Sequence, residues 1–200
     1  MLLCCPALTP MVLMILRMNS LPAAGRSGIL LLLLLWPLSA MTEEPAYESA
    51  ELEVNLTPRT PQQIAAFYEG RGFSEPMIAI LREQCFITVF IHNKSDDIIW
   101  LDLADWEFAD SDGPLRRRDR ADWKARWQKR DIPLAHQSTF RWTLLPEKLD
   151  FLPGERKGGN ITLPRHNQPF TLHARFDTGE ARDGDPIEIT LEELQCADNP

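Results

Sequence analysis

The residues with the clearest potential for binding chemistry lie in a basic segment, residues 116–131. It contains eight arginine and lysine side chains against three aspartates, a net charge of +5. Leu115, Trp123 and Trp127 are separated by multiples of four residues, so a helix near 117–130 would place them along one face. We therefore predict a helix that contacts an anionic surface, such as phospholipid or lipopolysaccharide headgroups, or an acidic protein. The candidate binding residues are Arg116, Arg117, Arg118, Arg120, Trp123, Lys124, Arg126 and Trp127.

A purely structural role for the same segment stays open. In that interpretation the two indoles pack inside the domain, and the cations are solvated or pair with the domain's own carboxylates. After residue 40 the chain holds 19 basic and 29 acidic side chains, a net charge of −10, so it carries −15 without the basic segment. Exposed ion pairs of this kind contribute at most about 1 kcal/mol each.

An acidic run precedes the basic segment and could offer oxygen ligands to calcium. Its members are Asp96, Asp97, Asp102, Asp105, Glu107, Asp110 and Asp112. Their spacing does not match a twelve-residue EF-hand loop, and alternation along a strand would separate several of them. Asp110 and Asp112 form the sharpest candidate pair. We nevertheless expect turn-forming and solvated carboxylates here, and no metal site.

The histidines offer little support for metal or acid–base chemistry. His92, His136, His166 and His173 form no H-x-H or H-x-x-x-H pair, and the chain has no G-x-S-x-G, H-E-x-x-H or P-loop motif. We therefore predict a protein that is not an enzyme and needs no cofactor. The alternative is a hydrolase-like site assembled from dispersed residues, with Asp102, Asp105 and His92 as candidates.

Two of the four cysteines are expected to form a disulfide. Cys4 and Cys5 belong to the N-terminal leader, which leaves Cys85 and Cys196 as partners in an oxidising compartment. The bridge would close a loop of about 110 residues, for which chain entropy suggests at most about 4–5 kcal/mol of stabilisation. Two free thiols, one buried and one near a frayed terminus, are the alternative.

The N-terminus has the form of a secretory signal. The apolar stretch 28–40 contains six consecutive leucines, follows Arg26 and ends in Leu38-Ser39-Ala40. It is shorter than the ~20 apolar residues that span a bilayer. We predict cleavage near Ala40 and a periplasmic or secreted protein of a bacterium, without a transmembrane span in the mature chain. Met18 could be the true start, and an uncleaved anchor is the alternative to cleavage.

The 160 residues after the signal suit one domain with one core. Their acidic balance argues against general nucleic-acid binding, which needs a basic surface. Residues 41–49 are polar and are predicted to be a flexible leader, residues 50–196 the folded domain, and residues 197–200 a tail.

Hydrophobic periodicity predicts a mainly β domain with two short helices near 61–70 and 75–83. Thr60, Pro61 and Gln63 form a helix start with a capping box. Period-two alternation and apolar runs indicate strands at 52–56, 85–91, 98–103, 139–145, 160–163, 170–176 and 187–191. Between two of these strands, Gly158-Gly159 is expected to mark a bulge or the close approach of another backbone.

About seven short strands separated by turns favour a single antiparallel β-sandwich. The turns Asn93-Lys94-Ser95-Asp96, Asp110-Ser111-Asp112-Gly113 and Leu152-Pro153-Gly154-Glu155, with the strands around them, resemble immunoglobulin-like domains of exported bacterial proteins. The resemblance covers residues 84–191 and implies the fold and hardly the function. The sequence thus predicts an exported, non-catalytic binding or structural module whose partner is an unidentified protein or an anionic envelope component.

Overall fold

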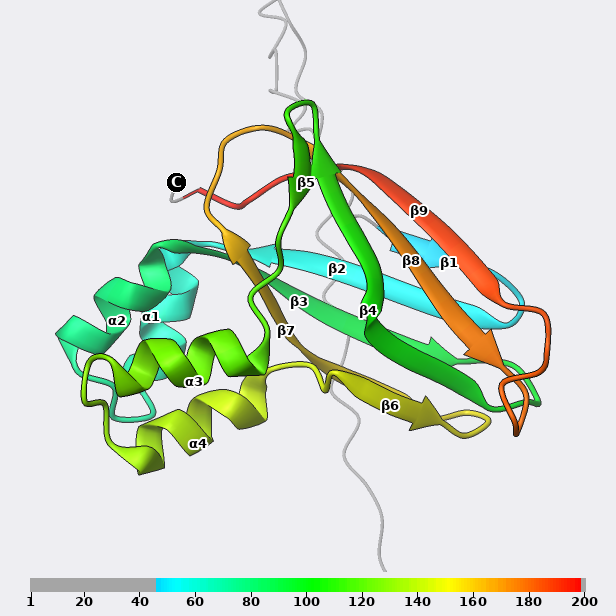
Figure 1. Cartoon of the computed structure of the whole chain (residues 1–200), viewed down its shortest axis with the longest axis horizontal. Coiled ribbons are helices and arrows are strands. Elements are labelled where there is room, and N and C mark those ends of the chain that lie inside the picture. Colours follow the sequence, from blue (N-terminus) through cyan, green and yellow to red (C-terminus); the bar gives the residue numbers. More distant parts are fainter. Residues whose placement is uncertain (1–45, 199–200) are drawn as a thin grey trace, which may run out of the picture. The chain divides into compact units, whose positions relative to one another are not determined.

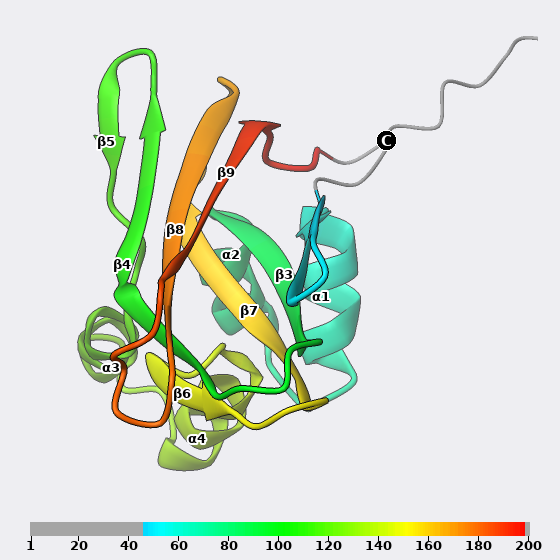
Figure 2. The same cartoon turned by 90° about the vertical axis from the view of Figure 1, so that its right-hand side faces the viewer.

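The computed structural model describes residues 46–198, which form two antiparallel sheets and four helices (Figures 1 and 2). The predicted signal segment and residues 41–45 lie outside the described residues. The mainly β, sandwich-type fold predicted from the sequence is confirmed. Among the described residues, none of the helices is long and apolar enough to cross a membrane.

The first sheet has the strand order β1-β2-β3-β7, with every neighbouring pair antiparallel. Its central strands β2 and β3 contain the predicted strands 52–56 and 85–91. The strands are β1 (Ala46–Glu48), β2 (Leu52–Arg59), β3 (Gln84–Asn93) and β7 (Arg156–Pro164).

The second sheet has the order β5-β4-β8-β9, and β6 pairs with the N-terminal end of β4, whereas β5 pairs with its C-terminal end. The register between β4 and β8 shifts between Leu101 and Trp106, where β4 bends (Figure 1). The strands are β4 (Ile99–Asp110), β5 (Gly113–Leu115), β6 (Lys148–Phe151), β8 (Phe170–Thr178) and β9 (Ile187–Leu194).

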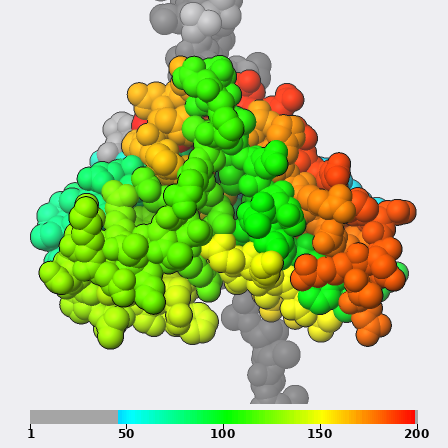
Figure 3. Space-filling model, in the orientation of Figure 1, coloured from blue at the N-terminus to red at the C-terminus, as the bar shows by residue number. Residues whose placement is uncertain are grey.

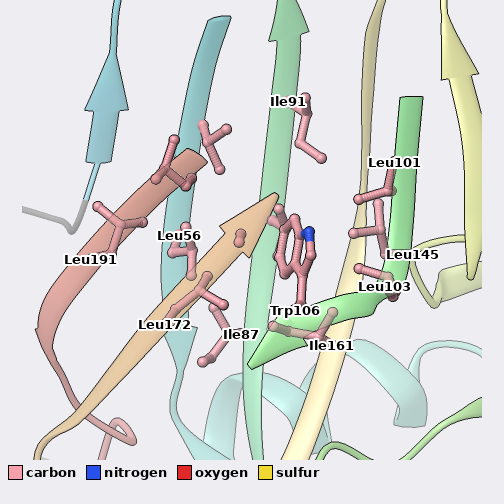
Figure 4. Packing of buried hydrophobic residues seen from close by; sticks show 14 of the residues in the cluster. Leu56, Ile87, Ile91, Leu101, Leu103, Trp106, Leu145, Ile161, Leu172 and Leu191 are labelled. Carbon is pink, nitrogen blue, oxygen red and sulfur yellow. The ribbon is translucent and has the colours of Figure 1, made fainter. Parts of the chain in front are cut away.

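The main core lies between the two sheets. In β8, Phe170, Leu172 and Phe176 are 0–2 % exposed and join this core, while Thr171 and His173 between them are not buried. Figure 4 shows side chains from both layers meeting there, among them Ile87, Leu101, Trp106 and Leu172. Alternating side chains thus hold the layers together by burial of apolar surface.

A second core lies under the helices, on the outer face of the first sheet. The four helices gather at one end of the sandwich (Figure 1). Phe86 of β3 belongs to this second cluster, whereas Ile87 and Val89 belong to the first. The helices are α1 (Pro61–Glu69), α2 (Glu75–Arg82), α3 (Arg120–Gln128) and α4 (Leu134–Thr143).

Local signals explain why α1 begins where the sequence predicts. Gln63 N donates to Thr60 Oγ1 (3.1 Å), and Thr60 N donates to Gln63 Oε1 (3.0 Å), which completes the capping box. A second box, which we did not foresee, starts α3. Asp122 N donates to Asp119 Oδ1 (2.7 Å), and Asp119 N donates to Asp122 Oδ2 (3.1 Å).

Two predictions of secondary structure and segment boundaries were wrong. Residues 139–145 were expected to form a strand, but Leu134–Thr143 form helix α4. Thr139, Phe140 and Trp142 have high strand propensity, yet Phe140 and Leu144, four residues apart, both enter the helical core, and packing overrides propensity. The predicted leader 41–49 is also too long, because Ala46–Glu48 pair with β2 as an edge strand.

The structure contains the expected bridge between Cys85 and Cys196. Their Cα atoms are 5.3 Å apart, and 111 positions separate them in the sequence. Cys85 lies near the start of β3, a central strand of the first sheet, so the bridge ties the C-terminal segment after β9 to the other layer of the sandwich.

Candidate ligand groove between helices α3 and α4

The two helices of the candidate site are inserted between β5 and β6 of the second sheet. Before α3, Arg118 N donates to Thr162 O of β7 (2.8 Å), which anchors the chain against the first sheet. After α3, Asp131 takes a positive φ of 52°, and Ile132 N donates to Trp127 O (3.1 Å). This tight connection reverses the chain, so that α4 lies beside α3 (Figure 1).

The two tryptophans of α3 are buried and hold the helix to the domain. Trp123 and Trp127 are 2 % and 1 % exposed, and their rings stack with centroids 5.2 Å apart. The Phe140 ring lies 4.4 Å from Trp123, and Trp123 Nε1 donates to Thr162 Oγ1 (2.8 Å). The interpretation of these indoles as anchors in an external surface is therefore wrong for this conformation. Through these two side chains, α3 packs against Phe140 of α4 and against the first sheet.

Many of the predicted binding cations have partners within the domain. Among the candidates, Arg116 pairs with Asp122 (2.8 Å), Arg117 with Glu147 (2.5 Å) and Arg126 with Glu83 (2.9 Å). Arg118 Nε donates to Gln84 Oε1 (2.5 Å), and Arg120 Nη2 donates to Leu144 O (3.2 Å). The structural role that the sequence left open therefore accounts for most of these arginines.

The pairing with Arg116 changes the ionisation of its partner. Partial burial of Asp122 acts to raise its pKa, but the hydrogen bonds from Arg116 and from the Asp119 backbone outweigh it, so the pKa of Asp122 is lowered. The same contact raises the pKa of Arg116. Both groups are therefore charged at neutral pH.

A groove with a volume of about 520 Å³ opens between α3 and α4. Its floor is apolar and consists of Trp123, Trp127, Phe140 and Leu144, which are at most 6 % exposed. Three cations also line it: Arg120, Lys124 and Arg141. No carboxylate is present among the described residues that line this groove. Figure 3 shows the green and yellow-green side chains of this region forming one corner of the molecular surface.

Two polar groups in the lining are buried and lack a partner. Arg120 Nε and Trp127 Nε1 have no hydrogen-bond acceptor within residues 46–198. Both atoms are donors, and unpartnered buried donors are uncommon because they lose their hydration without compensation. The groove therefore combines an apolar floor with positive charge, and the two unpartnered donors have almost no accessible surface.

The sequence identified only part of this groove. Arg120, Trp123, Lys124 and Trp127 were among the predicted residues, whereas the contribution of α4 was missed because that segment was interpreted as a strand. Pro133 before an i, i+4 pair of apolar residues was the available helix signal. Arg116, Arg117, Arg118 and Arg126 do not line the groove.

The structure does not bring the alternative catalytic residues together. Asp102 of β4 pairs with Lys148 (2.6 Å) on the outer side of the second sheet, and His92 of β3 contacts Glu53 (3.3 Å) on the outer side of the first. The main core lies between these two layers. Asp105 is exposed on β4. A site assembled from these three side chains therefore has no geometric basis in this fold.

Asp110 of the acidic run closes a turn in the described part of the chain. Asp110 Oδ1 accepts hydrogen bonds from Asp112 N (2.8 Å) and Gly113 N (3.1 Å), which closes the turn between β4 and β5. Within residues 46–198, no group of three or more histidine, cysteine, aspartate or glutamate side chains is arranged to hold a metal ion.

Comparisons with known proteins do not identify a family. No family model matches the chain, and no curated protein matches it. Among solved structures, the chain is similar to the ycdA protein of Bacillus subtilis, which is named as a candidate lipoprotein. The two sequences are 13 % identical, and the match covers 76 % of this chain with a TM-score of 0.40. It spans 39 % of the length of that protein. It is also similar to the yjhA protein of Bacillus subtilis, with 10 % identity and a TM-score of 0.38, over 64 % of this chain and 76 % of that one. Likenesses this distant carry no functional argument.

Proposed function

We propose that the protein is an exported, non-catalytic binding module that holds a single anionic amphiphile in the groove between α3 and α4. The observation that carries the proposal is the composition of the groove: an aromatic floor and three cations, with no carboxylate among its described lining residues. An apolar ligand body would cover the floor, and an acidic head would accept hydrogen bonds and neutralise the rim.

The charge distribution favours a small ligand over a broad anionic surface. Arg116, Arg117 and Arg126 are already paired with carboxylates, which reduces the positive field that the basic segment can project. The rest of the chain after residue 40 carries −15, and a flat anionic membrane would face that charge as well. A ligand of a few hundred cubic ångströms, confined to the groove, would meet only the local cations.

Export is the second element of the proposal. The leucine-rich leader has the composition of a secretory signal, and the Cys85–Cys196 bridge suits an oxidising compartment. An anionic amphiphile is also a ligand that a cell envelope supplies, either as a lipid headgroup with its acyl chain or as a free acyl acid.

The proposal is tested by titrating the full-length protein with laurate and dodecyl phosphate, while recording tryptophan fluorescence and calorimetric heat. Dodecyl maltoside, with the same chain and a neutral head, and inorganic phosphate, with no chain, separate the two halves of the ligand. We expect binding of the two anionic amphiphiles that weakens with salt, because the contacts are partly ionic. Equal binding of dodecyl maltoside would refute the role of the cations.

A matched pair of charge reversals locates the site. Lys124→Glu with Arg141→Glu removes two groove cations and should weaken binding about tenfold or more, which corresponds to at least about 1.4 kcal/mol. Lys129→Glu with Arg130→Glu makes the same change in net charge just beyond α3, at exposed positions outside the groove lining, and should leave the affinity almost unchanged. Equal losses in both double variants would show a diffuse electrostatic effect in place of a groove site.

A further inference from the structure

A second hollow lies on the outer face of the first sheet, at the edge of the area that the helices cover. The register places Phe86, Thr88 and Phe90 of β3 on this face, opposite Thr162, Asn160 and Gly158 of β7. Phe86 and Thr162 are buried under the helices, whereas Phe90 is 39 % exposed. The covered part of the sheet therefore ends between these two rows, and a hollow of about 570 Å³ opens there.

Three aromatic side chains from three different elements form the walls of this hollow. Phe67 of α1 is 38 % exposed, Phe90 of β3 is 39 % exposed and Trp142 of α4 is 78 % exposed. Each leaves a large apolar surface in contact with water, although apolar burial is worth about 25 cal/mol per Å². An aromatic cluster that stays exposed at the rim of a hollow is typical of a ligand site.

The floor carries a row of polar groups. Arg59 Nε donates to Thr88 Oγ1 (2.9 Å), and Thr88 Oγ1 donates to Asn160 Oδ1 (2.9 Å), so that a row of polar groups crosses the sheet. Beside this row, Gly158 and Gly159 present backbone in place of side chains. The bond to Thr88 uses the Nε–H of Arg59, and the guanidinium carries four further N–H donors on its two Nη groups.

The lining of the hollow carries positive charge, from Arg59. No carboxylate occurs among its lining residues in the described part of the chain. Besides Arg59, the Arg71 guanidinium lies over the Phe67 ring, 3.5 Å from its centroid, and the Arg141 guanidinium lies 5.8 Å from the centroid of Trp142. Three guanidinium groups thus accompany the aromatic walls, and they would repel a cationic ligand and attract an acidic one.

We propose that this hollow binds an acidic oligosaccharide, a chain of pyranose rings that carries carboxylate groups. Each pyranose has an apolar face of C–H groups that can stack on Phe67, Phe90 or Trp142, and a rim of hydroxyls that can bond to the polar floor. The carboxylate would pair with the guanidinium of Arg59. A simple alkyl chain would leave the floor donors unsatisfied, and the hollow is therefore chemically distinct from the groove between α3 and α4.

The proposal is tested with the full-length protein by calorimetry against tetragalacturonate, which is acidic, and maltotetraose, which is neutral. We expect tetragalacturonate to bind about tenfold or more tightly than maltotetraose. Trp142→Ala should weaken the binding of both sugars about tenfold, because it removes the most exposed stacking surface. Arg59→Gln should abolish the preference for the acidic sugar while weak binding of the neutral one remains.

Leu134→Ala is the matched control, because Leu134 is 77 % exposed on the same helix but lines the other groove. It should leave both sugar affinities unchanged. Absence of binding by either sugar would overturn the proposal, as would binding that survives Trp142→Ala. Concentration-dependent dimerisation that Trp142→Ala abolishes, without sugar binding, would assign the aromatic surface to a second copy of the chain instead. None of these outcomes depends on the amphiphile groove.

Discussion

A close approach of two backbone segments makes Gly159 a decisive position for stability. The isolated parallel bridge between Leu144 and Asn160 brings the segment after α4 against β7. A Cβ atom added to Gly159 would lie 2.5 Å from Leu145 N, 2.6 Å from Leu145 Cα and 2.9 Å from the carbonyl carbon of Leu144. All three are backbone atoms, so a rotamer change cannot relieve the overlap. The Gly159→Ala variant must push two chain segments apart.

The cost has two parts. Overpacking in a close-packed interior typically costs about 1–3 kcal/mol. Because the neighbours here are backbone atoms, which cannot rotate away, we expect a cost at the upper end of this range, about 3 kcal/mol. Separation of the segments also weakens the hydrogen bond from Leu145 N to Asn160 O (3.0 Å), which contributes about 1 kcal/mol. We therefore expect Gly159→Ala to lower the free energy of unfolding by about 3–4 kcal/mol, a large fraction of the stability of an ordinary domain.

Urea denaturation followed by circular dichroism measures this loss. The matched control is Gly70→Ala, because a Cβ there would meet its nearest neighbour, Ala66 O, at an ordinary 3.5 Å. Gly70 has φ −60° and ψ −11°, which alanine adopts readily, so the control should be neutral or slightly stabilising. A loss below about 1 kcal/mol for Gly159→Ala would refute the argument that this crossing is rigid.

Three further changes test the contacts that hold the sites in place. Asp122→Asn removes the charge that pairs with Arg116 and faces the start of α3, and urea denaturation should show a loss of about 1 kcal/mol at pH 7. Because the folded-state pKa of Asp122 is lowered, this stability is present above its unfolded pKa of about 3.9 and is lost as pH falls through the folded pKa, so the variants should converge in acid. Replacing Cys85 and Cys196 by serine should cost about 2–5 kcal/mol, and a reductant should destabilise the parent to a similar extent but leave this variant unchanged. Trp123→Phe removes the donor to Thr162 Oγ1 and should cost about 1–3 kcal/mol with native circular dichroism; a neutral result would contradict the buried hydrogen bond.

The sandwich could be predicted because its signals are local. Strict alternation in β8 and the capping box at Thr60 each specify an element without reference to the rest of the chain. The close approach at Gly159 was also anticipated, since adjacent glycines beside a strand indicate that another backbone comes near. The partner of that approach, Leu144–Leu145, could not be identified from the sequence, because it depends on how α4 returns to the sheet. The immunoglobulin-like resemblance stays a prediction.

The binding surfaces were harder to predict because their residues come from elements that are distant in the sequence. Trp123 and Trp127 have the same spacing whether they face a membrane or Phe140, and only the packing of α4 decides between the two. Similarly, the net charge of the basic segment does not show that Arg126 meets Glu83, 43 positions away. Composition identified the segment that matters, but not which of its side chains remain available.

The division into two cores explains where binding can reside in this fold. The facing sides of both sheets form the main core, in which Leu56, Ile91 and Leu172 are 0 % exposed, so these sides are not accessible to a ligand. The helices cover only part of the outer face of the first sheet, and one hollow opens between α3 and α4 while the other lies at the edge of the helical cover. Helix α4 contributes to each of them, Arg141 to one and Trp142 to the other. The helix that the strand prediction missed is thus the element on which both proposed sites depend.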